Sequence, residues 1–144
     1  MRLRGRVRAV IDTNVLVSAQ FWHGAPHNLL VHVRDGNVTP ILSPALLAEF
    51  AEVIGRAKFR AILQQTGRAQ SRILAELLHL AELIDPPPLP TPVCRDPDDD
   101  KILALARAAQ ADVIISGDRD LLTLGSFHDI PILTPADALA AIAT

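Results

Sequence analysis

The chain has 144 residues, 49% of them hydrophobic and 21% charged, and its formal net charge is −2. This length and composition can bury one hydrophobic core, so we expect a single domain over residues 1–144. The charge excludes overall attraction to a polyanion as a guide to function, and a single cysteine with scattered histidines argues against a disulfide or a zinc site. No apolar run approaches the ~20 residues of a membrane span, and Asp12 comes too early for a signal peptide, so a cytoplasmic protein without membrane contact is expected.

The first half of the chain is predicted to alternate strands and helices. An apolar strand over residues 6–11 ends directly at Asp12, and a helix follows over residues 14–22. A helix over 26–35 stops at Gly36-Asn37, and a strand over 38–42 comes next. Ser43 and Pro44 then begin a helix that extends to residue 57 and carries Glu49 in its middle.

The second half continues the same alternation after a helical hairpin. Helices are predicted over residues 58–65 and 69–83, and the proline-rich residues 86–92 form a loop. A helix follows the acidic run RDPDDD, a strand precedes Asp118, and a short helix (119–124), a strand (130–133) and a last helix from Pro135 complete the chain. This order predicts an α/β fold with a mostly parallel sheet covered on both faces.

Acidic residues gather where this fold would bring them together. Two predicted strands end in Asp12 and Asp118, and strand ends of a parallel sheet share one edge. Helix capping explains one or two acids of the run Asp96, Asp98, Asp99 and Asp100, but adjacent carboxylates repel unless a cation neutralises them. All-oxygen sites suit Mg²⁺ or Mn²⁺, and paired ions about 3.5 to 4 Å apart support phosphodiester cleavage.

Each acid also has an ordinary structural interpretation. Asp12 can cap a helix beside Asn14, and Asp118 or Asp120 can cap the short helix that follows them. Glu49 can face solvent on an amphipathic helix. The joint pattern is therefore stronger evidence than any single residue.

Four segments in order resemble the PIN-domain family, in its branch of VapC-like ribonuclease toxins from bacterial toxin–antitoxin pairs: VIDTNVLVSA, SPALLAEFAEVIGRAKF, RDPDDDKILALA and ADVIISGDRDLL. The resemblance spans nearly the whole chain and implies a three-layer α/β/α domain. It also implies an Mg²⁺- or Mn²⁺-dependent ribonuclease that cuts RNA, with a small antitoxin protein as partner and a homodimer as a common assembly.

The resemblance also implies which side chains form the site. Asp12, Glu49, Asp99 and Asp118 would be the catalytic and metal-binding acids, joined at the metal by Asp120. The DPxD pattern of this branch implies Asp99, accompanied by Asp96, whereas the spacing back from Asp118 in some shorter PIN toxins would also admit Asp100. Helical phase does not choose between them, because the predicted helix is apolar nearly all round. Thr13, Asn14 and Ser116 would orient the carboxylates or water.

Substrate contacts and rival functions stay open at this point. The alternating arginines Arg2, Arg4, Arg6 and Arg8 suit phosphate contacts or a solvated terminus. A second candidate surface has Lys58, Arg56 and Arg60, with Phe21 and Trp22 as bases' stacking partners or as core residues. The alternatives to a toxin are a non-catalytic binding module of the same fold and a housekeeping nuclease that processes RNA or DNA.

Overall fold

The computed structural model describes residues 2–142 and consists of strands and helices in an alternating order. In chain order the elements are β1 (Val7–Ile11), α1 (Thr13–Phe21), α2 (Ala25–Arg34), β2 (Val38–Leu42), α3 (Pro44–Ile54), α4 (Ala57–Thr66), α5 (Gln70–Leu80), β3 (Glu82–Leu83), α6 (Pro97–Ala109), β4 (Val113–Ile115), α7 (Arg119–Leu124), β5 (Ser126–Phe127), β6 (Ile130–Leu133) and α8 (Pro135–Ile142). The predicted bounds of β2, α7 and β6 are confirmed.

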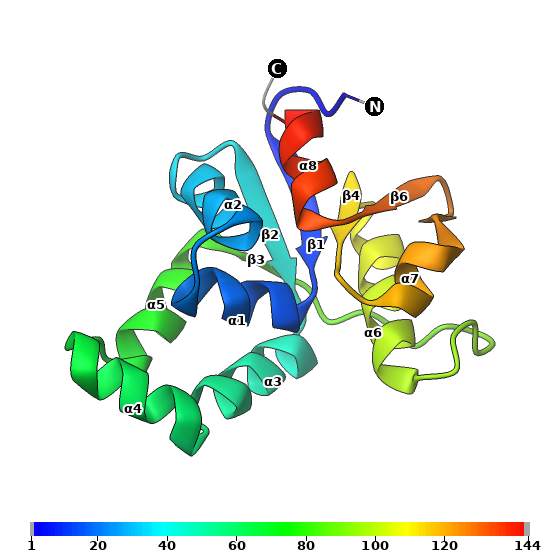
Figure 1. Ribbon diagram of the computed structural model, residues 1–144. Helices are drawn as coiled ribbons and strands as arrows, with labels where there is room; N and C mark the ends of the chain where they lie inside the picture. Colours follow the sequence, from blue (N-terminus) through cyan, green and yellow to red (C-terminus); the bar gives the residue numbers. More distant parts are fainter. Residues whose placement is uncertain (1, 143–144) are drawn as a thin grey trace.

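A six-stranded sheet in the order β3-β2-β1-β4-β6-β5 forms the centre of the molecule. All neighbouring strands run parallel except the last pair, β5 and β6, so the predicted mixed α/β fold with a mostly parallel sheet is confirmed. Helices α1, α2 and α8 lie on one side of the sheet and α6 on the other (Figure 1). The carboxyl ends of β1, β2 and β4 therefore meet at one edge, between the first turns of α1, α3 and α6.

Burial on both faces of the sheet explains why the sequences of the central strands are continuous apolar runs. Val10 of β1 and Ile114 of β4 are fully buried, as is Leu103 of α6, because helices cover both faces of the sheet. The start of α3 is fixed locally: the Ser43 hydroxyl accepts a hydrogen bond from the Leu46 N–H at 3.1 Å. Among residues 2–142, no helix has the length and apolar character needed to cross a bilayer.

Two predicted helices were too long at their carboxyl ends, and one short strand was missed. The helix predicted to extend to residue 57 ends at Ile54, and the one predicted to extend to residue 83 ends at Leu80. Residues 82–83 instead form the edge strand β3, where Glu82 pairs with Ile41 in register. The two-residue strand β5 was not predicted. Both short strands depend on partners distant in the sequence or on a turn, which local propensity does not reveal.

Candidate active site

The sheet itself places Asp12 beside the end of β4. Ile11 and Ile115 are paired in the β1–β4 register, and the Asp12 N–H donates to the Ile115 carbonyl at 2.9 Å. Asp12 is buried and caps α1, where its side chain accepts a hydrogen bond from the Asn14 N–H at 3.3 Å. Strand end and helix cap therefore fix this carboxylate together.

Ser116 connects the two strand ends. Its hydroxyl donates to Asp12 Oδ2 at 2.8 Å and accepts from the Asp118 N–H at 3.0 Å. Ser116 is fully buried, so these bonds do not compete with solvent. Asp118 in turn caps α7 by accepting the Asp120 N–H at 2.8 Å. One hydroxyl thus holds both carboxylate-bearing segments in a fixed relation.

A third carboxylate enters from α6. Asp99 lies in the first turn of that helix with only 4% of its surface exposed, and its Oδ2 atom has no hydrogen-bond partner. One carboxylate oxygen from each of Asp99, Asp118 and Asp120 lies within 4.8 Å of the other two. An unpartnered buried carboxylate oxygen is costly, so this arrangement is one that a cation would stabilise.

The electrostatics of the cluster agree with its geometry. Burial, followed by the nearby charge of Asp118, raises the pKa of Asp99 to about 7. Burial also raises the pKa of Asp12, although the hydrogen bond from Ser116 opposes that effect. Both carboxylates are therefore disfavoured in the charged form that a metal ligand requires, and a divalent cation would reverse this.

The other acids of the Asp96–Asp100 run are used elsewhere. Asp96 is exposed and caps α6 by accepting the Asp98 N–H at 2.9 Å, while Asp98 forms an exposed ion pair with Lys101 at 3.3 Å. Asp100 accepts hydrogen bonds from the backbone of the preceding loop, at 3.1 Å from the Val93 N–H and at 2.8 Å from the Cys94 N–H. Of this run, the structure brings Asp99 into the cluster with Asp118 and Asp120.

Glu49 lies at the rim of the site. It is exposed on α3 and lines a hollow of about 350 Å³ together with Asp98, Lys101, Glu52 and Arg56. Partial burial, then the charges of Asp98 and Asp12, raise its pKa. The charge of Asp12 thus helps to raise the pKa of Glu49, although Glu49 is exposed and Asp12 is buried. An exposed carboxylate in this position can contact substrate or water.

Comparison with known proteins shows which family this chain belongs to. The sequence matches the PIN domain family over residues 8–120, a span that includes Asp12, Glu49, Asp99 and Asp118. The chain belongs to the PIN-domain family. It is 32% identical to the uncharacterized protein MJ1680 of Methanocaldococcus jannaschii over 120 residues, which are 83% of this chain and 76% of that protein.

A solved structure shares the PIN fold of this chain. The crystal structure of VapBC2 from Rickettsia felis bound to a DNA fragment from their promoter superposes with a TM-score of 0.56 and 15% identity, over 88% of this chain and 98% of that one. At this identity the likeness concerns the fold. Membership of the PIN-domain family supports nuclease activity, which hydrolyses phosphodiester bonds.

Three polar residues near the acids of this PIN domain, Asn14, Thr13 and Arg95, differ in the contacts that they make. Asn14 is exposed and contributes its backbone N–H to Asp12, whereas the buried Thr13 hydroxyl has no hydrogen-bond partner. Arg95, which the sequence did not single out, forms an ion pair with Asp120 at 2.9 Å. Its side chain is 87% exposed, so it can leave Asp120 at little cost. No sequence signal marks this pair, because a loop brings the two residues together.

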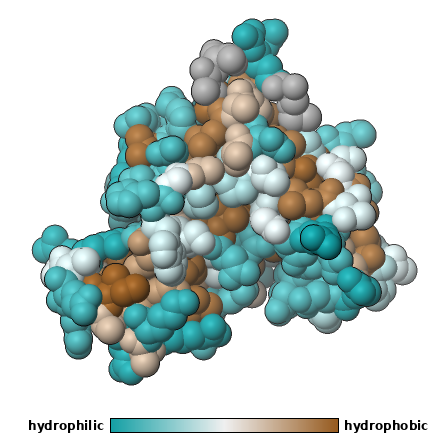
Figure 2. Space-filling model, in the orientation of Figure 1, coloured by the Kyte–Doolittle hydropathy of each residue, from teal (hydrophilic) through white to brown (hydrophobic). Residues whose placement is uncertain are grey.

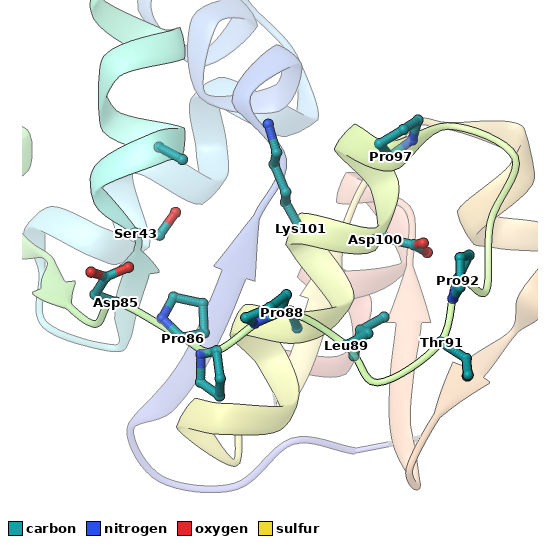
Figure 3. A pocket seen from close by; sticks show the side chains of 13 residues that line it. Ser43, Asp85, Pro86, Pro88, Leu89, Thr91, Pro92, Pro97, Asp100 and Lys101 are labelled. Atoms are coloured by element: carbon teal, nitrogen blue, oxygen red, sulfur yellow. The ribbon is translucent and has the colours of Figure 1, made fainter.

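A mainly apolar hollow beside the PIN site is separate from the carboxylate cluster. It has a volume of about 330 Å³ and lies between the proline-rich loop, which contributes Pro86, Pro88 and Leu89, and α6, which contributes Asp100 and Lys101 (Figure 3). Residues 97, 100, 101 and 104 share that face of α6 by helical spacing, whereas Asp99 points from another face. The hollow therefore contains no residue of the carboxylate cluster.

Proposed function

We propose that this protein is an Mg²⁺- or Mn²⁺-dependent endoribonuclease that hydrolyses RNA phosphodiester bonds with a single nuclease domain over residues 1–144. The observation that carries the proposal is the buried Asp99 carboxylate, with one unpartnered oxygen and a pKa of about 7, beside Asp118 and Asp120. In its charged form such a group is unfavourable for folding unless a cation binds it.

The donor set fits a hard divalent ion. Asp99, Asp118 and Asp120 offer carboxylate oxygens that lie within 4.8 Å of one another, and the neighbouring Asp12 and Glu49 can add two more. No sulfur or imidazole group of the described residues lies in the cluster, which favours magnesium or manganese over zinc. When bound, such an ion activates water and stabilises negative charge on the phosphodiester.

The side chains of this chain have distinct roles in the proposed reaction. Ser116 holds Asp12 and Asp118 in place through its two hydrogen bonds. Glu49, whose pKa is raised at the rim, orients the attacking water and accepts its proton. No side chain is required as a covalent nucleophile, since water itself would attack phosphorus. The P–O bond to one ribose oxygen would break in the same reaction, and that oxygen would leave and take up a proton from solvent.

We further propose that the nuclease is the toxin of a toxin–antitoxin pair and works in the cytoplasm, with a small antitoxin protein as partner and a homodimer as its assembly. The four motif segments that resemble VapC-like toxins support this role. The assembly named for the Rickettsia felis structure indicates the kind of partner to seek. A housekeeping nuclease would share the chemistry and lack the partner, so copurification of a small DNA-binding protein separates the two.

The deciding experiment is cleavage of a pool of structured and single-stranded RNA, with single-stranded DNA as a second substrate. Purified protein would be assayed with Mg²⁺, with Mn²⁺ and with a chelator, beside an Asp12→Asn, Asp99→Asn double variant. The exposed Asp35→Asn variant, outside the site, is the matched control. We expect metal-dependent RNA cleavage that only the double variant loses. Equal cleavage by the double variant would refute the site, and no cleavage by folded wild type would favour the non-catalytic binding module.

A further inference from the structure

We propose that residues 56–75, here called the basic arm, and Trp22 form a binding surface for single-stranded RNA, with an unpaired base stacked on the indole ring. This inference rests on the proposed ribonuclease function and identifies how its substrate is held.

The charge of the basic arm is opposite to that of the rest of the chain. Residues 56–75 contain no acid and five basic side chains, while the whole chain has a net charge of −2. The five are Arg56, Lys58, Arg60, Arg68 and Arg72. The arm comprises α4 and the first half of α5, and α4 lies away from the sheet at the lower left of Figure 1. Hydrophobic residues are exposed among the hydrophilic ones on this part of the surface (Figure 2). Concentrated positive charge of this kind attracts a phosphate backbone locally.

Trp22 is presented for stacking by two other rings. It is 47% exposed, and its ring meets those of Phe59 and Phe21 edge-on, with centroids 5.8 and 5.9 Å apart. Phe59 is buried and stacks on Phe21 at 4.6 Å, so the pair forms a fixed support. The exposed part of the indole, beside this fixed pair of rings, is where a nucleobase would stack.

The cations of the basic arm, of which Lys58 lies next to the Trp22 ring, have few acidic partners among the described residues. Lys58 Nζ lies 5.7 Å from the centre of the Trp22 ring. Arg60 and Arg72 are exposed, and within residues 2–142 neither makes an ion pair. Arg56 pairs with Glu52 at 2.9 Å, but both side chains are largely exposed, so a phosphate can replace the carboxylate.

The surface is continuous with the candidate active site. Arg56 lines the same hollow as Glu49, which joins the start of the arm to the rim of the acidic cluster. Asp12 and Trp22 flank the two ends of α1, about 15 Å apart at 1.5 Å per residue. Roughly four to five stacked nucleotides, at about 3.4 Å each, span that separation. A strand whose phosphodiester lies at the acids therefore reaches the indole a few nucleotides away.

Stacking on Trp22 requires a base that is not already paired. A duplex keeps its bases inside and would offer only phosphates, whereas a single strand offers both phosphates and ring faces. The combination of an exposed indole with the neighbouring Lys58 and the other cations of the basic arm thus selects a single strand.

The test uses the fact that Trp22 is the only tryptophan in the chain. Its fluorescence would be titrated in the presence of a chelator, first with an unlabelled single-stranded RNA of about 12 nucleotides and then with the matching duplex. This length lies within the range of about 4 to 16 nucleotides that domains binding single strands cover. We expect the single strand to quench the emission and the duplex to leave it nearly unchanged. Cleavage is absent from this assay, so its outcome is independent of nuclease activity.

Charge variants then locate the phosphates. A Lys58→Glu, Arg60→Glu double variant keeps the indole and should weaken binding at least tenfold, and it should reduce the slope of log K against log salt by about 1.4, or 0.7 per lost contact. Arg107→Glu, which alters charge in the last turn of α6, is the control and should bind as wild type.

Two results would overturn the inference. Absence of quenching by the single strand, in protein that still cleaves RNA, would leave the ribonuclease intact and assign the surface to a protein partner. Equal binding by the charge variant would remove the basic arm from the contact. Quenching without any metal-dependent cleavage would instead refute the proposed reaction and retain the RNA-binding surface.

Discussion

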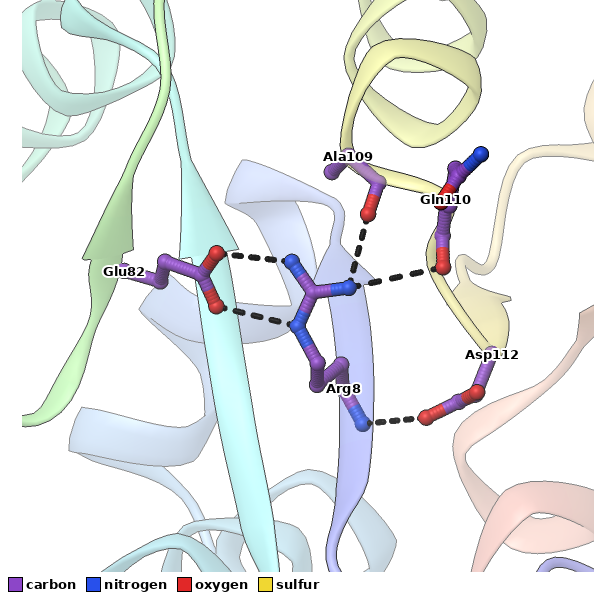
Figure 4. A network of polar contacts seen from close by, with 5 residues as sticks. All are labelled: Arg8, Glu82, Ala109, Gln110 and Asp112. Carbon is purple, nitrogen blue, oxygen red and sulfur yellow. Dashed lines mark hydrogen bonds and ion pairs between the residues drawn. The ribbon is translucent and has the colours of Figure 1, made fainter.

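Charged side chains have opposite kinds of neighbours at the two ends of the strands of the central sheet, here called the amino edge and the carboxyl edge. At the amino edge, the Arg8 guanidinium donates to both oxygens of Glu82, at 3.0 and 2.7 Å, and to the Ala109 carbonyl at 2.7 Å (Figure 4). The Arg8 N–H donates to Asp112 at 2.8 Å. This network joins β1, β3 and the carboxyl end of α6, where the carbonyl groups attract positive charge. Arg8 therefore supports the fold, a role that neither interpretation of the alternating arginines, phosphate contact or solvated terminus, included.

At the carboxyl edge, like charges are collected, and the buried Asp12 and Asp99 have no ion-pair partner among the described residues. The ion pair at the amino edge raises the pKa of Arg8 and lowers that of Glu82, so folding favours both charged forms. At the carboxyl edge the pKa values of Asp12, Glu49 and Asp99 are all raised, so folding disfavours their charged forms. The charged groups of the amino edge therefore stabilise the folded protein. The charged carboxylates of the carboxyl edge destabilise it, and binding of a cation would remove that cost.

The largest test of this contrast is Asp99→Asn. The substitution keeps the shape of the side chain and removes its charge, so we expect cleavage to fall at least about 100-fold, as loss of charge stabilisation does in other enzymes. In chelator the same variant should be more stable than wild type, because a repulsive buried carboxylate is gone. Cleavage assays and thermal denaturation measure the two effects. A variant that loses both activity and stability would show that Asp99 supports folding instead.

The opposite outcome is expected for Arg8→Ala. Loss of the network should lower the free energy of unfolding by about 2 kcal/mol, because several hydrogen bonds to a charged group disappear at once. The Arg8 side chain is 33% exposed, which limits the value of the ion pair itself. Urea denaturation measures the loss, and Glu82→Gln, which leaves the carbonyl contacts, should cost less. Cleavage by the folded variant should stay within twofold of wild type, and a tenfold decrease would show that the edges are coupled.

Ser116→Ala should have an intermediate effect. The hydroxyl orients Asp12 and the Asp118 backbone without touching substrate, so its removal should lower activity about tenfold, in the range seen for groups that support metal ligands. The deficit should appear as a higher Mg²⁺ concentration for half-maximal rate. Ser116→Thr, which keeps the hydroxyl, should recover part of the activity, and a lack of any recovery would contradict the positioning role.

Sequence reasoning reached the carboxyl edge more fully than the amino edge. Asp12 and Asp118 follow apolar strands, so their convergence was predictable from the parallel sheet and is confirmed. The choice of Asp99 over Asp100 was not available from helical phase, because Ile102, Leu103 and Leu105 are all buried. The packing of α6 between the sheet and the proline-rich loop decides which acid faces which side. It directs Asp99 to the carboxylate cluster and Asp100 to the loop backbone. Arg8 and Glu82 are 74 residues apart, and no local pattern predicts that they meet.

The raised pKa of Asp99 at the carboxyl edge should make the stability of the folded protein depend on pH, an effect smaller than those above. For Asp99 the folded pKa of about 7 lies above the ordinary value of 3.8, so the folded state binds this proton more tightly than the unfolded state. In chelator, stability should therefore be lost as pH rises from about 4 through 7, and the melting temperature of wild type should fall by a few degrees relative to Asp99→Asn. Saturating Mg²⁺ at pH 8 should restore it. Parallel pH profiles of the two proteins would contradict a shifted Asp99.

Arg95→Ala should give the smallest effect and sharpens the comparison at the carboxyl edge. The Arg95–Asp120 ion pair is the nearest counterpart there of the Arg8 network, yet Arg95 is 87% exposed and its side chain must pay entropy to stay in place. Removing it leaves Asp120 available to a cation, so the Mg²⁺ concentration for half-maximal cleavage should fall by about twofold, with unfolding unchanged. A titration of rate against Mg²⁺ measures this, with the exposed Arg107→Ala as the control. A rise in the Mg²⁺ requirement would mean that Arg95 holds Asp120 in position, and the carboxyl edge would then contain a stabilising pair of its own.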